Sequence, residues 1–195
     1  MKLLSGPTSP FARKCRIVAI EKSIVLEEVF TNPFDSDDLS SLNPLKMIPV
    51  LILEDETKIL DSDVICRFLN DIGEGVSLYP DENKWNYMTR ATLGHGLAEA
   101  SVQLQLQKIL PINEQSPPLM ERMSQRISRT LKSLDNQIAE LSECPIRIDT
   151  ICAVIGIGHL ELRHGSSWKD TYANLNRWYS SQLDRPSIAS THPKV

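Results

Sequence analysis

Short apolar runs of strand length dominate the first part of the chain. These predicted strands cover residues 2–5, 25–30, 49–53 and 57–60. A helix is predicted over residues 10–22, because Pro10 suits a first helical turn, where its missing N–H costs little. Another helix is predicted from Ser62 onward. The order strand, helix, strand, strand, strand, helix predicts an α/β unit over residues 1–78.

The hydrophobic period becomes helical after a break at residues 78–86. One apolar stripe ends before Pro111, and a second follows Pro118. Their apolar positions are Leu93, Leu97, Ala100 and Leu104 in the first stripe, and Met123, Ile127, Leu131, Leu134, Ile138 and Leu141 in the second. A third helix, over residues 149–164, is apolar nearly all round, which is typical of a helix buried at the centre of a domain. We therefore expect an all-helical second domain over residues 86–195.

The composition is that of an ordinary globular protein, with 195 residues, 41% hydrophobic and 24% charged. Acidic residues outnumber basic ones, 25 to 21, so the basic face of a nucleic-acid-binding protein is not expected. No segment approaches the roughly 18 consecutive apolar residues of a membrane span. No apolar signal core precedes Pro7. We therefore expect a cytoplasmic protein that binds neither nucleic acid nor membrane.

The cysteines and histidines show no spacing that is typical of a metal site or of a dithiol redox site. They are Cys15, Cys66, Cys144, Cys152, His95, His159, His164 and His192. Cys15 would lie on the apolar face of the first predicted helix, where packing is the expected role. We expect reduced thiols and no metal.

The pair Ile48-Pro49 opens the third predicted strand, directly after a loop. An X–Pro bond at such a corner can be cis. A cis bond would turn the backbone of Ile48 outward, where a peptide-like ligand could form a short antiparallel pairing with it. The alternative is an ordinary proline at the start of a strand.

Asp61 and Ser62 lie where the fourth predicted strand passes into a helix. Ser62 is a good N-cap residue, and free N–H groups at a helix start favour a ligand carboxylate. Asp61 could pair with a ligand ammonium group. Together the two residues fit the head group of an α-amino acid; simple capping of the helix is the alternative.

Thr8 and Ser9 lie where the first predicted strand passes into the first helix. A hydroxyl at this place could donate a hydrogen bond to a thiolate and so lower the pKa of the thiol. Capping of the helix is again the alternative. No histidine lies nearby in the sequence, so a Ser–His hydrolase is not supported.

Three motifs in this order resemble the cytosolic glutathione S-transferases, and most of all the bacterial members whose reactive residue is serine, a group similar to the zeta and theta classes. The motifs are Ser9-Pro10-Phe11-Ala12-Arg13-Lys14, Ile48-Pro49-Val50-Leu51 and Asp61-Ser62. The resemblance implies a thioredoxin-like βαβ-ββα domain over residues 1–78 that binds glutathione. It implies an all-helical domain over residues 86–195 that contributes the second-substrate pocket.

The resemblance also implies a role for each matching residue. Ser9 would be catalytic and stabilise the glutathione thiolate, with Thr8 as the rival for this role. Ile48, before a cis proline, would pair with the cysteinyl part of glutathione, and Asp61 and Ser62 would hold the γ-glutamyl end. The residues expected to bind glutathione are Ser9, Phe11, Lys46, Ile48, Pro49, Asp61 and Ser62.

The activity that the resemblance implies is conjugation of the glutathione thiolate to small electrophiles, as in detoxification, by a cytoplasmic homodimer without a metal. Ser9 cannot form the mixed disulfide of a thiol transferase, so a transferase or isomerase role is favoured. The alternatives are a glutathione-dependent isomerase or dehalogenase and a non-catalytic binding or regulatory protein of the same fold. The electrophile would lie against side chains such as Trp85, Tyr87 or Leu104.

One departure from the family pattern lies at the start of the central buried helix. The family commonly has a Ser/Thr-x-x-Asp capping box there, whereas this chain has Ile146 in place of the hydroxyl residue and keeps Asp149. A missing N-cap hydroxyl costs about 1 kcal/mol. We expect Asp149 to reach back to the backbone and the fold to be kept at lower stability.

Overall fold

The computed structural model describes residues 1–35, 38–142 and 145–193. Cys144 therefore lies outside the described residues. The contacts divide the chain into two units. The first unit comprises Met1–Tyr79 together with the segment that begins at Arg185, and the second unit comprises Pro80–Asp184.

The first unit contains a four-stranded mixed sheet. Its strands are β1 (Lys2–Ser5), β2 (Glu27–Phe30), β3 (Val50–Ile52) and β4 (Lys58–Leu60). The strand order is β2-β1-β3-β4, with β1 parallel to β2 and antiparallel to β3, and β3 antiparallel to β4. Leu3 in β1 lies opposite Leu51 in β3, and both side chains are buried. The predicted strands are confirmed, each within the predicted range.

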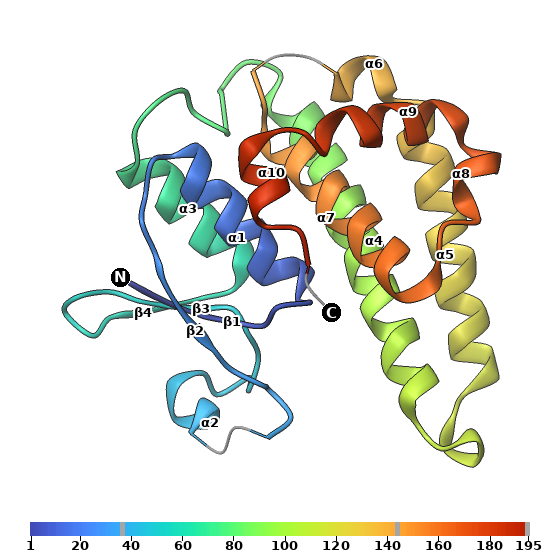
Figure 1. The fold of residues 1–195 in the computed structure, drawn as a ribbon, viewed down its shortest axis with the longest axis horizontal. Helices are drawn as coiled ribbons and strands as arrows, with labels where there is room; N and C mark the ends of the chain where they lie inside the picture. The colour runs from blue at the N-terminus through green and yellow to red at the C-terminus, as the bar shows by residue number, and fades with distance from the viewer. Residues whose placement is uncertain (36–37, 143–144, 194–195) are drawn as a thin grey trace. The chain divides into compact units, whose positions relative to one another are not determined.

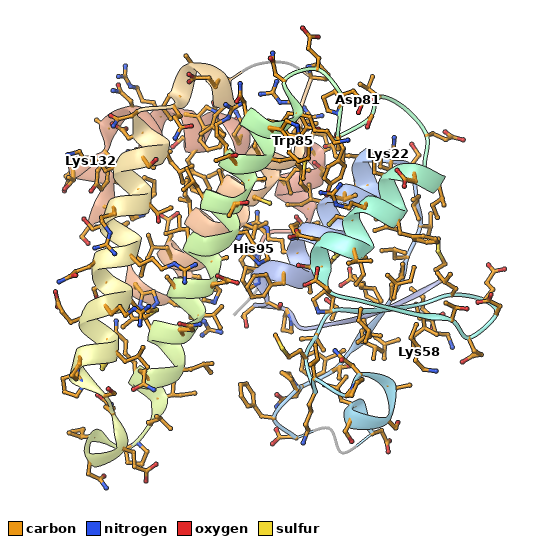
Figure 2. The ribbon with its side chains drawn as sticks, turned by 180° about the vertical axis from the view of Figure 1, so that it is seen from behind. Lys22, Lys58, Asp81, Trp85, His95 and Lys132 are labelled. Atoms are coloured by element: carbon orange, nitrogen blue, oxygen red, sulfur yellow. The ribbon has the colours of Figure 1, made fainter. Side chains whose placement is uncertain are left out.

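The helices of this unit are α1 (Pro10–Glu21), α2 (Leu39–Leu42), α3 (Ser62–Ile72) and α10 (Pro186–Ser190). The helices α1 and α3 lie side by side on one face of the sheet, and α2 lies on the other side (Figure 1). Figure 2 shows Lys22 directly after α1. Its Nζ donates to the carbonyls of Gly75 and Val76 at 3.2 and 3.3 Å. These bonds attach the segment after α3 to the end of α1.

The placement of α10 corrects the predicted domain boundary, because this helix packs on α1 in the first unit and not in the helical unit. The side chain of Arg13, which is 2% exposed, donates from Nη2 to the carbonyl of Ile188 at 3.2 Å. At the other end of α1, Glu21 accepts hydrogen bonds from Arg185 and Ser187. A buried guanidinium needs acceptors, and the C-terminal segment supplies them.

The second unit is all helical. Its elements are α4 (Lys84–Ile109), the 3₁₀ turn η1 (Ile112–Glu114), α5 (Pro117–Asp135), α6 (Ile138–Leu141), α7 (Ile148–His164), α8 (Trp168–Thr171) and α9 (Ala173–Gln182). Two long helices, α4 and α5, are joined through η1 (Figure 1). Every residue from Ile148 to Leu160 is buried, which confirms the predicted central helix. No helix within the described ranges has the length and hydropathy that a membrane crossing requires.

The second apolar stripe was expected to be one helix, and this is wrong. The helix α5 ends at Asp135, and α6 begins at Ile138. The side-chain amide of Gln137 donates to the carbonyl of Ser133 at 3.1 Å, which supplies a partner at the end of α5. The apolar spacing continues across this break, so the pattern does not reveal it.

The start of α7 also differs from the expectation. Asp149 Oδ1 accepts from the N–H of Thr150 at 3.0 Å, the next residue along the chain, and not from the preceding backbone. Its Oδ2 accepts from Nε of Arg90 at 3.0 Å and from Nη2 of Arg147 at 3.4 Å. The Asp149 carboxylate is therefore bonded to arginine side chains at the place where the family pattern has a capping box.

Candidate functional site

Ser9 is the N-cap residue of α1. Its backbone is extended, with φ −69° and ψ 119°, and its Oγ accepts from the N–H of Ala12 at 3.2 Å. A cap of this kind uses a lone pair of the hydroxyl oxygen and leaves the hydroxyl proton free to be donated. Capping and donation to a ligand are therefore compatible roles of this half-buried side chain.

Gly6 brings Ser9 and Ile48 close together. A methyl group at Gly6 would lie 2.9 Å from Cδ1 of Ile48, 3.8 Å from Cβ of Ser9 and 3.9 Å from the carbonyl oxygen of Thr31. A carbon atom at 2.9 Å is too close for an ordinary contact. The side chain of Ile48 would have to shift to admit a methyl group here, and glycine lets the end of β1, the start of α1 and the loop before β3 approach without that shift. The sequence reasoning missed this residue, although a glycine directly after a strand is a signal of close backbone approach.

The peptide bond between Ile48 and Pro49 is cis, as the resemblance implied. Pro49 is buried and Ile48 is half-buried at the start of β3. Among the described residues, the backbone N–H and C=O of Ile48 form no hydrogen bond. This peptide group is therefore available for pairing with an extended ligand.

The loop before this bond is held by Asn43, which the sequence reasoning did not single out. Asn43 is 2% exposed; its Nδ2 donates to the carbonyl of Met47 at 2.8 Å and its Oδ1 accepts from the N–H of Leu45 at 3.0 Å. Lys46 has a left-handed backbone, with φ 51°, and its N–H bonds to the carbonyl of Asn43. The side chain of Lys46 is exposed.

Asp61, and not Ser62, caps α3, which corrects the expectation from the sequence. Oδ1 of Asp61 accepts from the N–H groups of Asp63 at 2.8 Å and Val64 at 3.3 Å. A carboxylate caps a helix as well as a hydroxyl does, and here it precedes the serine by one residue. Two N–H groups of this helix start are thus already bonded. The N–H of Ser62, a residue 3% exposed, has no partner in the described part of the chain.

Residues of α1 reach this helix start. The ammonium group of Lys14 pairs with the carboxylate of Asp63. The thiol of Cys15 donates to the carbonyl of Ser62 at 3.8 Å and accepts from the thiol of Cys66 at 3.9 Å. Burial, together with the hydrogen bond to Cys15, raises the pKa of the Cys66 thiol well above its usual value. Both residues are fully buried, so Cys15 and Cys66 are packing residues.

Two of the three side chains expected against an electrophile are buried in the second unit. Tyr87 is 1% exposed, and its hydroxyl donates to the carbonyl of Pro80 at 2.6 Å. Leu104 is 6% exposed and lines a cavity of about 310 Å³ within this unit, together with Leu131, Trp168 and other residues. Trp85 is 76% exposed at the start of α4 (Figure 2).

Two histidines connect α4 to α7. Nδ1 of His159 lies 2.8 Å from Oγ of Ser101, and Nε2 of His164 lies 2.9 Å from the carbonyl of Ser101. Burial lowers the pKa of His159 to about 4, and the charges of Arg163 and His164 act in the same direction. Burial also lowers the pKa of His164, against the bond to Ser101. These neutral rings serve as hydrogen-bond partners between the helices.

Known proteins share this fold and parts of this sequence. Residues 8–72 match the family described as "Glutathione S-transferase, N-terminal domain". The chain is similar to a crystal structure of a glutathione S-transferase from Methylobacillus flagellatus KT with GSH bound; the two are 32% identical, each is covered over 99% of its length, and the TM-score is 0.92.

Two further relatives cover nearly the whole chain. A glutathione transferase family member from Pseudomonas fluorescens Pf-5 with bound glutathione is 29% identical, with 100% of this chain and 99% of that chain covered and a TM-score of 0.92. The uncharacterized GST-like protein YibF of Escherichia coli K12 is 26% identical over 199 residues, which are 99% of this chain and 98% of that protein.

Proposed function

The chain belongs to the glutathione S-transferase family, and from this premise we propose that its first unit binds glutathione and that Ser9 activates the glutathione thiol for attack on a small electrophile. The observation that carries the proposal is the meeting of Ser9 and Ile48 around Gly6. A hydroxyl donor and an unpaired peptide group lie together there, as the cysteinyl part of glutathione requires.

The thiol end of glutathione is assigned to Ser9. The hydroxyl oxygen is occupied by the N–H of Ala12, so the hydroxyl proton is directed to the ligand. A hydrogen bond donated to sulfur stabilises the thiolate over the thiol and lowers the thiol pKa toward neutrality. Phe11, half-buried in the first turn of α1, supplies an apolar wall beside the sulfur.

The peptide part of glutathione is assigned to the corner before β3. The N–H and C=O of Ile48, held by the cis bond to Pro49, form two antiparallel hydrogen bonds with the cysteinyl residue. The exposed ammonium group of Lys46 pairs with the glycyl carboxylate. A surface ion pair of this kind contributes less than about 1 kcal/mol, so Lys46 has the smallest role of these residues.

The γ-glutamyl end is assigned to the start of α3. Both capping bonds of Asp61 use Oδ1, and the carboxylate as a whole keeps its negative charge for the γ-glutamyl ammonium group. The N–H and hydroxyl of Ser62 receive the α-carboxylate, which the positive end of the helix dipole also favours.

The reaction follows from holding the thiolate beside an electrophilic carbon. Sulfur forms the new C–S bond, and either a leaving group departs with its electron pair or a proton adds to the conjugated product. Binding both reactants raises their effective concentration, and Ser9 supplies the electrostatic stabilisation. A glutathione-dependent isomerase or dehalogenase shares this first step and differs in the second substrate.

The binding experiment is a calorimetric titration with reduced glutathione near pH 7, with a dissociation constant between micromolar and low millimolar expected. Asp61→Asn keeps the cap, because asparagine caps equally well and tolerates the φ of 70° found there. It removes only the charge, and we expect binding to weaken about tenfold. Ser62→Ala removes a hydroxyl at the carboxylate and also weakens binding.

Asp55→Asn is the matched control. Asp55 lies in the exposed turn between β3 and β4, where its Oδ1 accepts from the N–H of Thr57 at 3.0 Å, so it makes the same kind of local bond as Asp61. Its replacement should leave the affinity for glutathione unchanged. No binding by the wild type, checked with a second probe at several temperatures, contradicts the proposed function. Equal affinities of wild type and Asp61→Asn contradict the assignment of Asp61.

Turnover is tested with a panel of electrophiles that contains aryl halides, epoxides and α,β-unsaturated carbonyl compounds. Conjugate formed by the wild type and lost in Ser9→Ala supports the transferase. Glutathione binding without any reaction of the panel favours the non-catalytic alternative. Release of halide without a conjugate favours the dehalogenase, and an isomerised product favours the isomerase.

We also propose a homodimer. Large apolar side chains are exposed between β2 and β3, among them Phe34 at 69% and Met47 at 56%, and a second copy would cover them. Sedimentation at micromolar concentration should give twice the chain mass of 22.0 kDa. A monomer at this concentration contradicts the proposal.

A further inference from the structure

Lys14 of α1 forms an ion pair with Asp63 at the start of α3. The side chain of Lys14 has no exposed surface, whereas that of Asp63 is 54% exposed. Burial of an ammonium group is costly unless a partner compensates it. The chain therefore holds a positive charge in the interior, directly below the first turn of α3.

This first turn carries two carboxylates. Asp61 caps the helix, and Asp63 follows two residues later; the N–H of Ser62 between them is unpaired within the described residues. A helix N-terminus carries only about half a positive charge, so two uncompensated carboxylates would outweigh it and repel an anionic ligand. One carboxylate is needed for a ligand ammonium group, and the second is not.

We infer that Lys14 is a positioning residue of the glutathione site: it neutralises Asp63, so that the α-carboxylate of the γ-glutamyl group can bind at Ser62 while Asp61 keeps its charge for the ammonium group. The inference rests on the proposed function, and it adds a buried residue that does not touch the ligand. Lys14 acts through charge, and it also connects the helix that begins beside Ser9 with the helix that begins at Ser62.

The electrostatic role can be separated from a purely structural one by the sign of each effect. If the pair only holds α1 against α3, loss of either partner weakens binding alike. If Lys14 neutralises Asp63, Lys14→Met takes away the positive charge beside that carboxylate and weakens binding, whereas Asp63→Asn removes the carboxylate and does not. The double variant has neither charge and should bind as the wild type does.

The experiment measures the dissociation constant of reduced glutathione by calorimetry at low ionic strength for the full chain. We expect Lys14→Met to bind about tenfold more weakly, Asp63→Asn to bind equally or more tightly, and the double variant to lie within about twofold of the wild type. Arg16→Met is the control, since Arg16 on the same helix pairs with Glu28 of β2 at 3.6 Å and its replacement should change nothing.

A second ligand tests whether the weaker binding of Lys14→Met depends on the α-carboxylate of glutathione. The peptide 4-aminobutyryl-cysteinylglycine has the ammonium group of glutathione but no α-carboxylate, so Lys14→Met should not weaken its binding. A penalty equal to that for glutathione contradicts the inference.

The failure modes are distinct. If the wild type binds no glutathione, the proposed function and this inference both fall. If the wild type binds and Lys14→Met binds equally well, only the inference falls. If Lys14→Met does not fold, Asp63→Asn decides, because weaker binding by this variant contradicts the neutralising role.

Discussion

Arg90 of α4 donates from Nε to Oδ2 of Asp149 of α7 at 3.0 Å, and the Asp149 side chain has no exposed surface. The pair joins the two central helices of the second unit at the point where α7 begins without a side-chain cap. Removal of Arg90 leaves the buried carboxylate with only the longer bonds from Arg147, at 3.4 Å. We expect Arg90→Met to lower the free energy of unfolding by about 2 to 3 kcal/mol, less than the loss of an only partner would cost.

Chemical denaturation followed by circular dichroism measures this change. Arg122→Met on the exposed face of α5 is the control and should unfold as the wild type does. A stability loss for Arg90→Met no larger than that of the control would mean that the pair contributes little.

Two glycines of α4 should respond in opposite ways to alanine. A methyl group at Gly94 would lie 2.4 Å from the backbone nitrogen of Ala153 in α7, which cannot move alone. A methyl group at Gly96 would meet Nη2 of Arg126 at 2.9 Å, the end of a flexible side chain. We expect Gly94→Ala to cost about 3 kcal/mol and Gly96→Ala to be neutral or stabilising by up to about 1 kcal/mol, because alanine favours helix.

Thermal unfolding of both variants tests this difference. Equal melting temperatures would contradict the close approach of α4 and α7 at Gly94.

Gly6→Ala should disturb the site more than the fold. The added methyl group would displace Cδ1 of Ile48, the residue whose peptide group we propose pairs with glutathione, and it would lie within the proposed site. We expect glutathione to bind about threefold to tenfold more weakly while the melting temperature changes little. Ile48→Val removes Cδ1, so the double variant should recover the lost affinity. Calorimetry on the wild type, the two single variants and the double variant checks this coupling. Binding free energies that change additively would exclude it.

Ser9→Ala should move the pH profile of conjugation. Loss of the donated hydrogen bond raises the pKa of the bound thiol. We therefore expect kcat/KM at pH 7 to fall by at least about tenfold, and the increase of kcat/KM with pH to occur at higher pH. Glutathione affinity changes little. Ser9→Thr keeps the hydroxyl and should retain activity. An unchanged profile in Ser9→Ala, with a shifted profile in Thr8→Ala, would assign the role to Thr8.

His159 should make the second unit sensitive to acid. Its pKa is about 4 in the folded chain, because of burial first, whereas an unfolded histidine titrates near 6.5. Between about pH 6.5 and pH 4 only the unfolded chain takes up this proton. The free energy of unfolding therefore decreases as the pH is lowered through this range, by up to about 3 kcal/mol. Below about pH 4 both states are protonated and this group causes no further loss.

His159→Asn keeps a side-chain amide that can hydrogen-bond to Ser101, whose Oγ lies 2.8 Å from Nδ1 of His159, and it cannot take up the proton. Its unfolding free energy should therefore be less dependent on pH over this range than that of the wild type. His192→Asn, at an exposed residue, should keep the wild-type slope. Parallel slopes for all three proteins would rule out His159 as the origin.

Much of the candidate site could be anticipated from local patterns. Ser9 and Pro10 at a strand-to-helix junction indicate a helix start, and Pro49 opening an apolar run indicates a strand corner. The prediction that Ser62 caps α3 was wrong, because Asp61 and Ser62 are both good caps and only the backbone path selects one. Asn43 and Gly6 were missed, since their partners are a loop carbonyl and a side chain distant in sequence.

The sequence by itself determined the four strands with α1 and α3 along the chain, the burial of α7 and the family, because hydrophobic period and short motifs are local properties of the chain. Tertiary structure alone decided that α10 packs on α1, that Lys14 reaches Asp63 and that Arg90 compensates Asp149. Each of these depends on a buried charge or donor finding its partner across the fold. A buried polar group must be paired, but the chain pattern does not say by which residue.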